Sequence, residues 1–246
     1  MPLSSNSLIH FANNIEAIKG ILETDFNISY CRERVTLGGK SQEFHVPMVS
    51  FCDIPLSEIK EHIHKYGNYA IGMTKDWGMR QGLNPVLYMA QTSFLSDSYR
   101  KVWNDMIDAS EDECWTDSEL ATADILRYIK NYEADLTRKG KTIKNYRFSD
   151  EREWRYVPPH SVDCDHIISS EWYNEQKNKN EADAKIKSLK LSFDPEDIKY
   201  IIISDDKEIG DIVDHLRRAK GKLYSFHELE RLTTRILTVE QIKTDI

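Results

Sequence analysis

The sequence lacks the features that mark secreted, membrane-spanning and zinc-finger proteins. Its 246 residues include four cysteines with no C-x-x-C pair among them, so neither a zinc knuckle nor a dithiol redox site is indicated. No stretch approaches the roughly 20 apolar residues that a membrane-spanning helix needs. The amino terminus has neither the basic start nor the apolar run of a signal peptide. These absences predict a cytoplasmic protein that does not enter a membrane.

Nucleotide-binding and hydrolase motifs are also missing. The sequence contains no G-x-x-x-x-G-K-[ST] loop, no G-x-G-x-x-G turn and no G-x-S-x-G elbow, which argues against P-loop, Rossmann and serine-hydrolase enzymes. His62 and His64 lie two apart on a predicted helix, so their side chains point about 200° apart and cannot share a metal ion. No metal site is predicted.

The composition fits one compact, acidic globular domain. Hydrophobic residues make up 40% of the chain and charged residues 30%, with a formal net charge of −8. This charge argues against non-specific attraction to phosphate backbones, but it does not rule out a local basic groove. Because no Pro-, Gly- or Ser-rich linker divides the chain, we expect a single domain over residues 1–246.

Hydrophobic periodicity predicts an α+β fold. Predicted strands lie at 8–11, 44–54, 69–73, 84–89, 151–157, 189–193 and 198–204. Predicted helices lie at 15–22, 56–65 and 206–220, and 174–185 fits either a helix or a loop. Helical spacing over 93–139 predicts a helical insertion between sheet strands.

The segment Glu151-Arg152-Glu153-Trp154-Arg155 carries the strongest local signal for chemistry. On a strand, Glu151 and Glu153 project to one face about 7 Å apart, and two such carboxylates can act on one electrophilic centre. Alternatively, the segment is a solvent-facing edge strand on which Glu and Arg side chains pair with each other.

Two further positions also allow two interpretations. His10 lies inside an apolar strand, where a histidine is either a hydrogen-bonded core residue or a donor in a pocket. Ser50 stands beside Phe51 at the end of a buried strand, where its hydroxyl either lines a cleft or satisfies the backbone.

Four segments together resemble the AbiGi family of bacterial abortive-infection proteins. They are residues 8–11, 46–56, 66–86 and 151–155. The resemblance implies a role in phage defence, as the antitoxin or regulatory member of a two-gene system. The partner it implies is a nucleotidyltransferase-like toxin.

A more distant similarity is to ADP-ribosyltransferase-like folds. It lies in the order of an amino-terminal strand histidine, a strand end with a hydroxyl or aromatic residue, and a late strand bearing Glu-x-Glu. The similarity implies mixed and antiparallel central sheets and NAD as a substrate. The segment Val49-Ser50-Phe51 departs from this pattern, because it lacks the Ser-Thr-Ser signature of one branch.

This second similarity also implies roles for individual residues. Glu153 would stabilise the oxocarbenium-like transition state, and Glu151 would orient an acceptor that is a nucleic acid or a protein. The implied NAD-binding residues are His10 at the ribose, Tyr66 or Tyr69 stacked on the nicotinamide, and Ser50 and Phe51 at the strand end.

Two hypotheses from different classes therefore stand. An NAD-dependent ADP-ribosyltransferase predicts a concave pocket lined by His10, Ser50 and Glu153. A non-catalytic module that binds a toxin or regulator predicts an exposed apolar patch and indifference to the loss of Glu153. Fold analogy does not decide between them.

Overall fold

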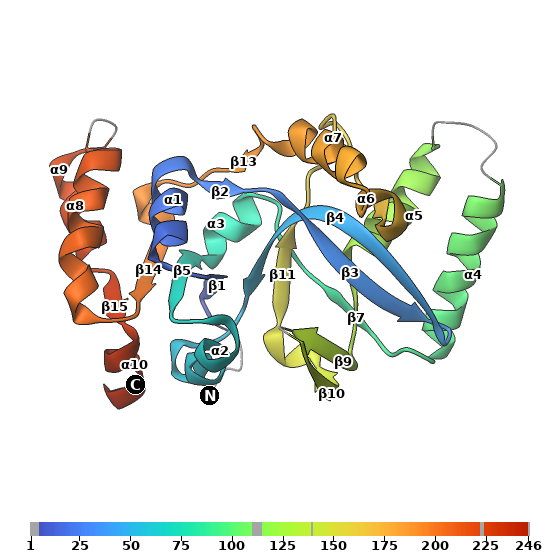
Figure 1. Ribbon diagram of the computed structural model, residues 1–246, viewed down its shortest axis with the longest axis horizontal. Helices are drawn as coiled ribbons and strands as arrows, with labels where there is room; N and C mark the ends of the chain where they lie inside the picture. The colour runs from blue at the N-terminus through green and yellow to red at the C-terminus, as the bar shows by residue number, and fades with distance from the viewer. Residues whose placement is uncertain (1–4, 110–114, 139, 222–223, 246) are drawn as a thin grey trace. The chain divides into compact units, whose positions relative to one another are not determined.

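The computed structural model describes residues 5–109, 115–138, 140–221 and 224–245 (Figure 1). The chain forms two compact units. Unit 1 comprises Met1–Asn27, Val49–Leu83 and Leu189–Ile246, and unit 2 comprises Ile28–Met48 and Asn84–Ser188. Each unit contains helices and strands, which confirms the α+β prediction, whereas the single domain over 1–246 stays a prediction. Among the described residues, no helix is both long and apolar enough to cross a bilayer.

Unit 1 is built on a sheet with the strand order β15-β14-β5-β1-β4, to which β4 contributes its last residues. Neighbouring strands are antiparallel except β14 and β15, which are parallel. The elements of unit 1 are β1 (Ser7–Ala12), α1 (Ile15–Thr24), β2 (Phe26–Asn27), η1 (Leu56–Glu58), α2 (Ile59–Tyr66), β5 (Tyr69–Thr74), α3 (Lys75–Arg80), β13 (Lys190–Leu191), η3 (Pro195–Asp197), β14 (Ile198–Ile203), η4 (Asp206–Glu208), α8 (Ile209–Lys220), α9 (Phe226–Thr233), β15 (Ile236–Thr238) and α10 (Val239–Asp245).

Local sequence signals explain the first elements of unit 1. The Asn14 side chain caps α1 by accepting a hydrogen bond from the Ala17 amide at 2.9 Å, as the sequence predicted. Gly72 on β5 lies opposite Tyr200 on β14. A Cβ at Gly72 would lie 2.9 Å from the Tyr200 ring, so glycine gives that ring its space on the sheet.

Unit 2 contains β4 up to Met48 and several shorter strand pairs. In this unit β4 pairs with β3 and β12, β11 with β6, β7 with β8, and β9 with β10. The elements of unit 2 are β3 (Ser29–Leu37), β4 (Lys40–Cys52), β6 (Asn84–Pro85), β7 (Leu87–Met89), α4 (Phe94–Ala109), α5 (Asp117–Tyr128), β8 (Ile129–Asn131), β9 (Glu133–Arg138), β10 (Lys141–Arg147), η2 (Phe148–Glu151), β11 (Glu153–Tyr156), β12 (Ile168–Ser169), α6 (Ser170–Tyr173) and α7 (Gln176–Ile186).

The hairpin of β3 and β4 turns at Gly38 and Gly39. Both have positive φ, 53° and 73°, which a two-residue hairpin turn of this hand requires and glycine adopts freely. The Gly38 amide donates a hydrogen bond to the Ser96 hydroxyl of α4 at 2.8 Å. A Cβ at Gly38 would overlap the carboxylate of Asp97, so the tip of the hairpin fits closely against the start of α4.

The core of unit 2 lies between its strands and the pair α4 and α5. Helix α4 contributes Trp103 and Met106, and α5 contributes Ala123 and Leu126. These side chains pack with buried apolar residues of β3 and β4. The hydrophobic contact area of this core holds the two helices in place.

Several predicted elements need correction. The predicted helical insertion 93–139 holds for α4 and α5, but 129–138 forms β8 and β9; residues 110–114 and 139 lie outside the described residues. Helix α5 ends because Ile129 adopts an extended conformation, and Ile129 and Asn131 are then buried on one side of a strand paired with β7. The predicted strand 84–89 divides into β6 and β7.

Candidate functional site

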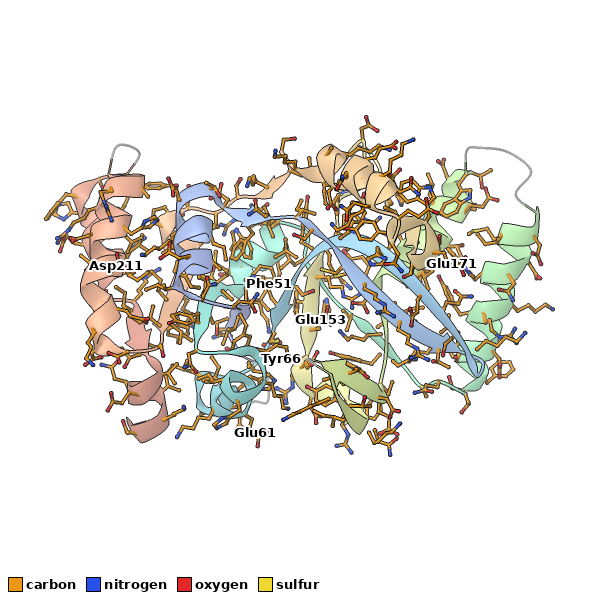
Figure 2. All side chains as sticks on the ribbon, in the orientation of Figure 1. Phe51, Glu61, Tyr66, Glu153, Glu171 and Asp211 are labelled. Carbon is orange, nitrogen blue, oxygen red and sulfur yellow. The ribbon has the colours of Figure 1, made fainter. Side chains whose placement is uncertain are left out.

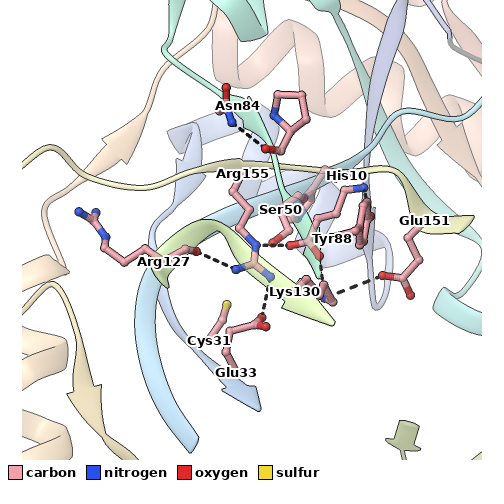
Figure 3. A network of polar contacts seen from close by, with 12 residues as sticks. His10, Cys31, Glu33, Ser50, Asn84, Tyr88, Arg127, Lys130, Glu151 and Arg155 are labelled. Atoms are coloured by element: carbon pink, nitrogen blue, oxygen red, sulfur yellow. Dashed lines mark hydrogen bonds and ion pairs between the residues drawn. The ribbon is translucent and has the colours of Figure 1, made fainter. Parts of the chain in front are cut away.

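Glu153 lies on β11 between two cations. Its Oε1 accepts a hydrogen bond from Arg155 Nε at 2.5 Å, and its Oε2 accepts one from Lys130 Nζ at 2.6 Å (Figure 3). Arg155 is on the same face of the strand because it is two residues further along, whereas Lys130 comes from β8. Glu153 is 5% exposed and Arg155 is fully buried. The solvent-facing interpretation of this strand is therefore wrong, although its expectation of a Glu–Arg pair is confirmed.

The network continues beyond the first pair. Arg155 Nη2 pairs with Glu33 Oε1 of β3 at 3.0 Å, and its Nη1 donates to the Arg127 carbonyl at 2.9 Å. The Glu153 amide donates to the Tyr88 hydroxyl at 2.8 Å. Glu153 and Arg155 are thus held by each other and by partners from other elements of unit 2. Such a network fixes both the position and the ionisation of Glu153.

Charge balance sets the pKa values in this network. Burial raises the pKa of Glu153, but the charges of Arg155 and Lys130 together outweigh burial, so its pKa lies well below its usual range. Burial lowers the pKa of Lys130, but Glu153 and Glu33 outweigh it and the net pKa is raised. Glu153 and Lys130 are therefore both ionised at neutral pH.

Glu151 is not on the strand, contrary to the sequence prediction. It ends η2, and Arg152 follows in the left-handed conformation with φ 45° before β11 begins. The alternation that predicted one strand is interrupted by this turn, so Glu151 and Glu153 are not successive same-face residues. Glu151 is 6% exposed, and its Oε1 accepts a hydrogen bond from the Tyr146 hydroxyl at 2.9 Å. Its other oxygen lies 3.9 Å from Lys130 Nζ.

His10, Ser50 and Phe51 lie together in unit 1. The His10 ring donates from Nδ1 to the Ser50 carbonyl at 2.9 Å, which makes Nδ1 the protonated nitrogen. Its ring centroid lies 5.2 Å from that of Phe26 and 5.5 Å from that of Phe51. Burial lowers the pKa of His10 despite this hydrogen bond. His10 is therefore a neutral, hydrogen-bonded histidine among aromatic rings, and its role at a ribose stays a prediction.

The aromatic residues predicted to bind NAD make contacts inside unit 1. Phe51, which is labelled in Figure 2, is 1% exposed. Its ring lies against Phe26 and Trp77. Tyr66 stacks on Phe11 with ring centroids 5.3 Å apart. The Tyr69 hydroxyl donates to Glu208 Oε1 at 2.7 Å. These contacts give each ring a structural partner, and stacking on nicotinamide stays a prediction for Tyr66 and Tyr69.

The predicted site residues divide between the two units. His10, Ser50, Phe51, Tyr66 and Tyr69 belong to unit 1, whereas Glu151 and Glu153 belong to unit 2. Neither unit by itself holds the complete set that an NAD pocket would require. Within the described residues, no group of three or more His, Cys, Asp or Glu side chains is placed to hold a metal ion.

Sequence reasoning missed two members of the charged network, Glu33 and Lys130. Lys130 fell within the predicted helical insertion, and the strand that carries Glu33 was not predicted. A signal for that strand was present, because Gly38-Gly39 between two extended runs is a typical hairpin turn. No local signal connects Glu33 to Arg155 or Lys130 to Glu153, since both contacts join distant segments.

Comparison with known proteins places the chain in a family. A family model described as "Putative abortive phage resistance protein AbiGi, antitoxin" matches residues 24–204. The chain belongs to the AbiGi family. A relative from Lactococcus lactis subsp. cremoris, named "Abortive phage resistance protein AbiGi", is 29% identical over 234 residues, covering 83% of this chain and 90% of the relative.

The AbiGi match covers both units but not every predicted site residue. His10 lies outside the matched residues 24–204, whereas Glu151 and Glu153 lie within them. No solved structure matches the chain. The ADP-ribosyltransferase-like type of fold therefore has no structural neighbour to support it and stays a prediction.

Proposed function

We propose that this AbiGi-family chain is the non-catalytic antitoxin of a phage-defence pair and that it restrains a toxin protein by binding it. The family description names an antitoxin. An antitoxin that binds a protein needs a stable scaffold and an exposed contact surface, and it needs no reactive carboxylate. The buried charged network and the exposed apolar residues of unit 2 fit that requirement.

The geometry of Glu153 is the observation that carries the proposal. Each of its carboxylate oxygens accepts a hydrogen bond from a cation, Arg155 or Lys130. A carboxylate that stabilises an oxocarbenium-like centre contributes through charge that is turned toward the substrate. Here the negative charge is already balanced by two neighbouring positive charges. Withdrawing Glu153 from them would leave buried cations without their partner, which is strongly unfavourable.

The experiment compares toxin neutralisation with NAD chemistry in the same protein. The chain is co-expressed with the toxin of the proposed pair, and bacterial growth reports neutralisation. Calorimetry with purified proteins then measures binding of the toxin and of NAD. We expect restored growth, a toxin complex and no nicotinamide release above a blank without protein. Failure to bind the toxin or to restore growth would overturn the proposal.

The second candidate function is an NAD-dependent ADP-ribosyltransferase that modifies nucleic acid or protein. One observation favours it: the lowered pKa of Glu153 keeps this residue ionised at neutral pH on a rigid strand. This candidate predicts NAD binding that is weakened in His10→Ala. It also predicts nicotinamide release in bacterial lysate that is lost in Glu153→Gln, provided that this variant still unfolds cooperatively.

A further inference from the structure

Helix α4 has one covered face and one uncovered apolar strip. Trp103 and Met106 point into the core of unit 2 and are each 8% exposed. Four other large apolar residues of this helix are exposed, namely Phe94, Leu95, Val102 and Ile107, and Leu95 and Val102 are 64% and 53% exposed. Figure 1 draws α4 and α5 side by side in green.

Leu95 and Val102 lie on one strip of the helix. At about 100° per residue, positions seven apart return to nearly the same direction, so Leu95 and Val102 are stacked two turns apart. The same rotation puts this strip directly beside Met106. The apolar surface of α4 therefore continues past the part that the core of unit 2 covers. A contiguous exposed apolar patch with polar residues around it marks a protein contact site.

The charge around this strip is mainly negative. Helices α4 and α5, as the structure describes them, contain six acidic and three basic residues. Two of the three basic residues are engaged within the pair of helices: Arg100 pairs with Asp97, and the buried Arg127 pairs with Asp124. Asp105 and Asp108 of α4 remain exposed. An apolar strip beside acidic side chains is complementary to an apolar groove rimmed by Lys and Arg.

We infer that the strip formed by Leu95 and Val102, with the acidic side chains of α4 and α5 around it, is the surface on which the toxin docks through a basic-rimmed apolar groove. This inference rests on the proposed antitoxin function and adds the site and the chemistry of the partner. A second copy of the chain is a poorer occupant, because a twofold contact through α4 would bring acidic side chains against acidic side chains.

The first test changes the apolar strip. Leu95→Asp is compared with Phe226→Asp, because both residues lie in the first turn of a helix and Phe226 is 70% exposed in unit 1. The helix dipole interacts favourably with an acidic side chain in the first turn, so both variants should fold. Calorimetry with the purified toxin should show binding weakened about 100-fold by Leu95→Asp and changed less than about threefold by Phe226→Asp. Val102→Gln, which preserves helix propensity, should weaken binding about tenfold.

The second test changes the charge. Asp105→Asn combined with Asp108→Asn should slow association with the toxin about tenfold at low salt and leave dissociation unchanged. The control combines Glu58→Gln with Glu61→Gln, two exposed residues of unit 1, and should leave both rates unchanged.

The outcomes separate the inference from the function on which it rests. If the wild type neutralises the toxin and Leu95→Asp neutralises it equally well, the docking surface is wrong and the antitoxin function stands. If the wild type does not bind the toxin, the proposed function itself fails. If light scattering shows a wild-type dimer that Leu95→Asp converts to a monomer, a second copy covers the strip and the inference is overturned.

Discussion

Unit 1 surrounds His10 with aromatic rings, whereas unit 2 surrounds Glu153 with opposite charges. The His10 side chain has its pKa lowered mainly by burial and is neutral. Glu153 is also buried, but Arg155 and Lys130 outweigh that effect and keep it charged. The comparison shows that burial decides ionisation only where no strong partner is present. It also predicts that the two sites respond differently to substitution and to pH.

The largest expected effect is in the charged network. Arg155→Ala removes the partner of two carboxylates, Glu153 and Glu33, and leaves them with uncompensated charge. We expect the free energy of unfolding to fall by about 3–5 kcal/mol, measured by urea denaturation. Arg34→Ala, an exposed neighbour on β3 with a side chain that is 68% exposed, is the control and should change it by less than about 0.5 kcal/mol. Equal effects would contradict the difference between the buried and exposed arginines.

A smaller effect is expected in the aromatic cluster of unit 1. Phe51→Leu keeps an apolar side chain but loses the ring contacts with Phe26 and Trp77. We expect the free energy of unfolding, measured by urea denaturation at pH 8, to fall by about 1 kcal/mol. At this pH the neighbouring His10 ring, 5.5 Å from Phe51, is neutral. A different loss at pH 5 would show that Phe51 is coupled to the titration of His10.

The stability of the wild type should depend on pH through the charge of Glu153. The folded-state pKa of Glu153 is depressed, so its contribution to stability is present above its usual pKa near 4.5 and is lost as the pH falls toward the folded value. Urea denaturation of wild type and Glu153→Gln should therefore give a stability difference that is largest at pH 7 and narrows toward pH 3. A difference independent of pH would contradict the role of its charge.

The smallest expected effect concerns His10. Its folded-state pKa is lowered, so the unfolded chain binds a proton more readily, and His10 reduces stability as the pH falls below its usual pKa of 6.5. His10→Phe removes both this titration and the hydrogen bond to the Ser50 carbonyl. We expect the free energy of unfolding, measured by urea denaturation, to be about 1 kcal/mol lower in His10→Phe than in the wild type at pH 8. This difference should be smaller at pH 5.5. Nuclear magnetic resonance titration of the His10 ring in the wild type provides the independent check.

Local signals in the sequence predicted the elements that depend on neighbours in the chain. The Asn14 cap, the helix after it and the strand at 69–73 are found as predicted, because capping and hydrophobic alternation act over a few residues. The segment 129–138 was wrongly predicted to be helical. Its first part, β8, pairs with the distant strand β7 through tertiary contacts, whereas β9 forms a hairpin with the next strand, β10. The spacing of hydrophobic residues predicts secondary structure poorly where such contacts determine it.

The candidate site likewise combines features that local signals predicted with features that depend on tertiary contacts. Period-two alternation correctly put Glu153 and Arg155 on one face, but it extended that strand through Glu151, where Arg152 makes a left-handed turn. The pairing of Glu153 with Lys130 joins residues 23 apart in the chain. No alternation or motif carries that information, because the contact exists only after β8 and β11 have folded.

The tight turn at Gly38 has a mechanical consequence. The strand that carries Glu33 reaches its turn at Gly38, whose amide is anchored to Ser96, the residue next to Leu95. Glu33 in turn is anchored to Arg155. Strand β3 is thus attached at its turn to the start of α4 and, through Glu33, to the charged network. A protein that binds α4 would therefore also restrain β3. Slower hydrogen exchange of the Gly38 amide in the complex would report this restraint.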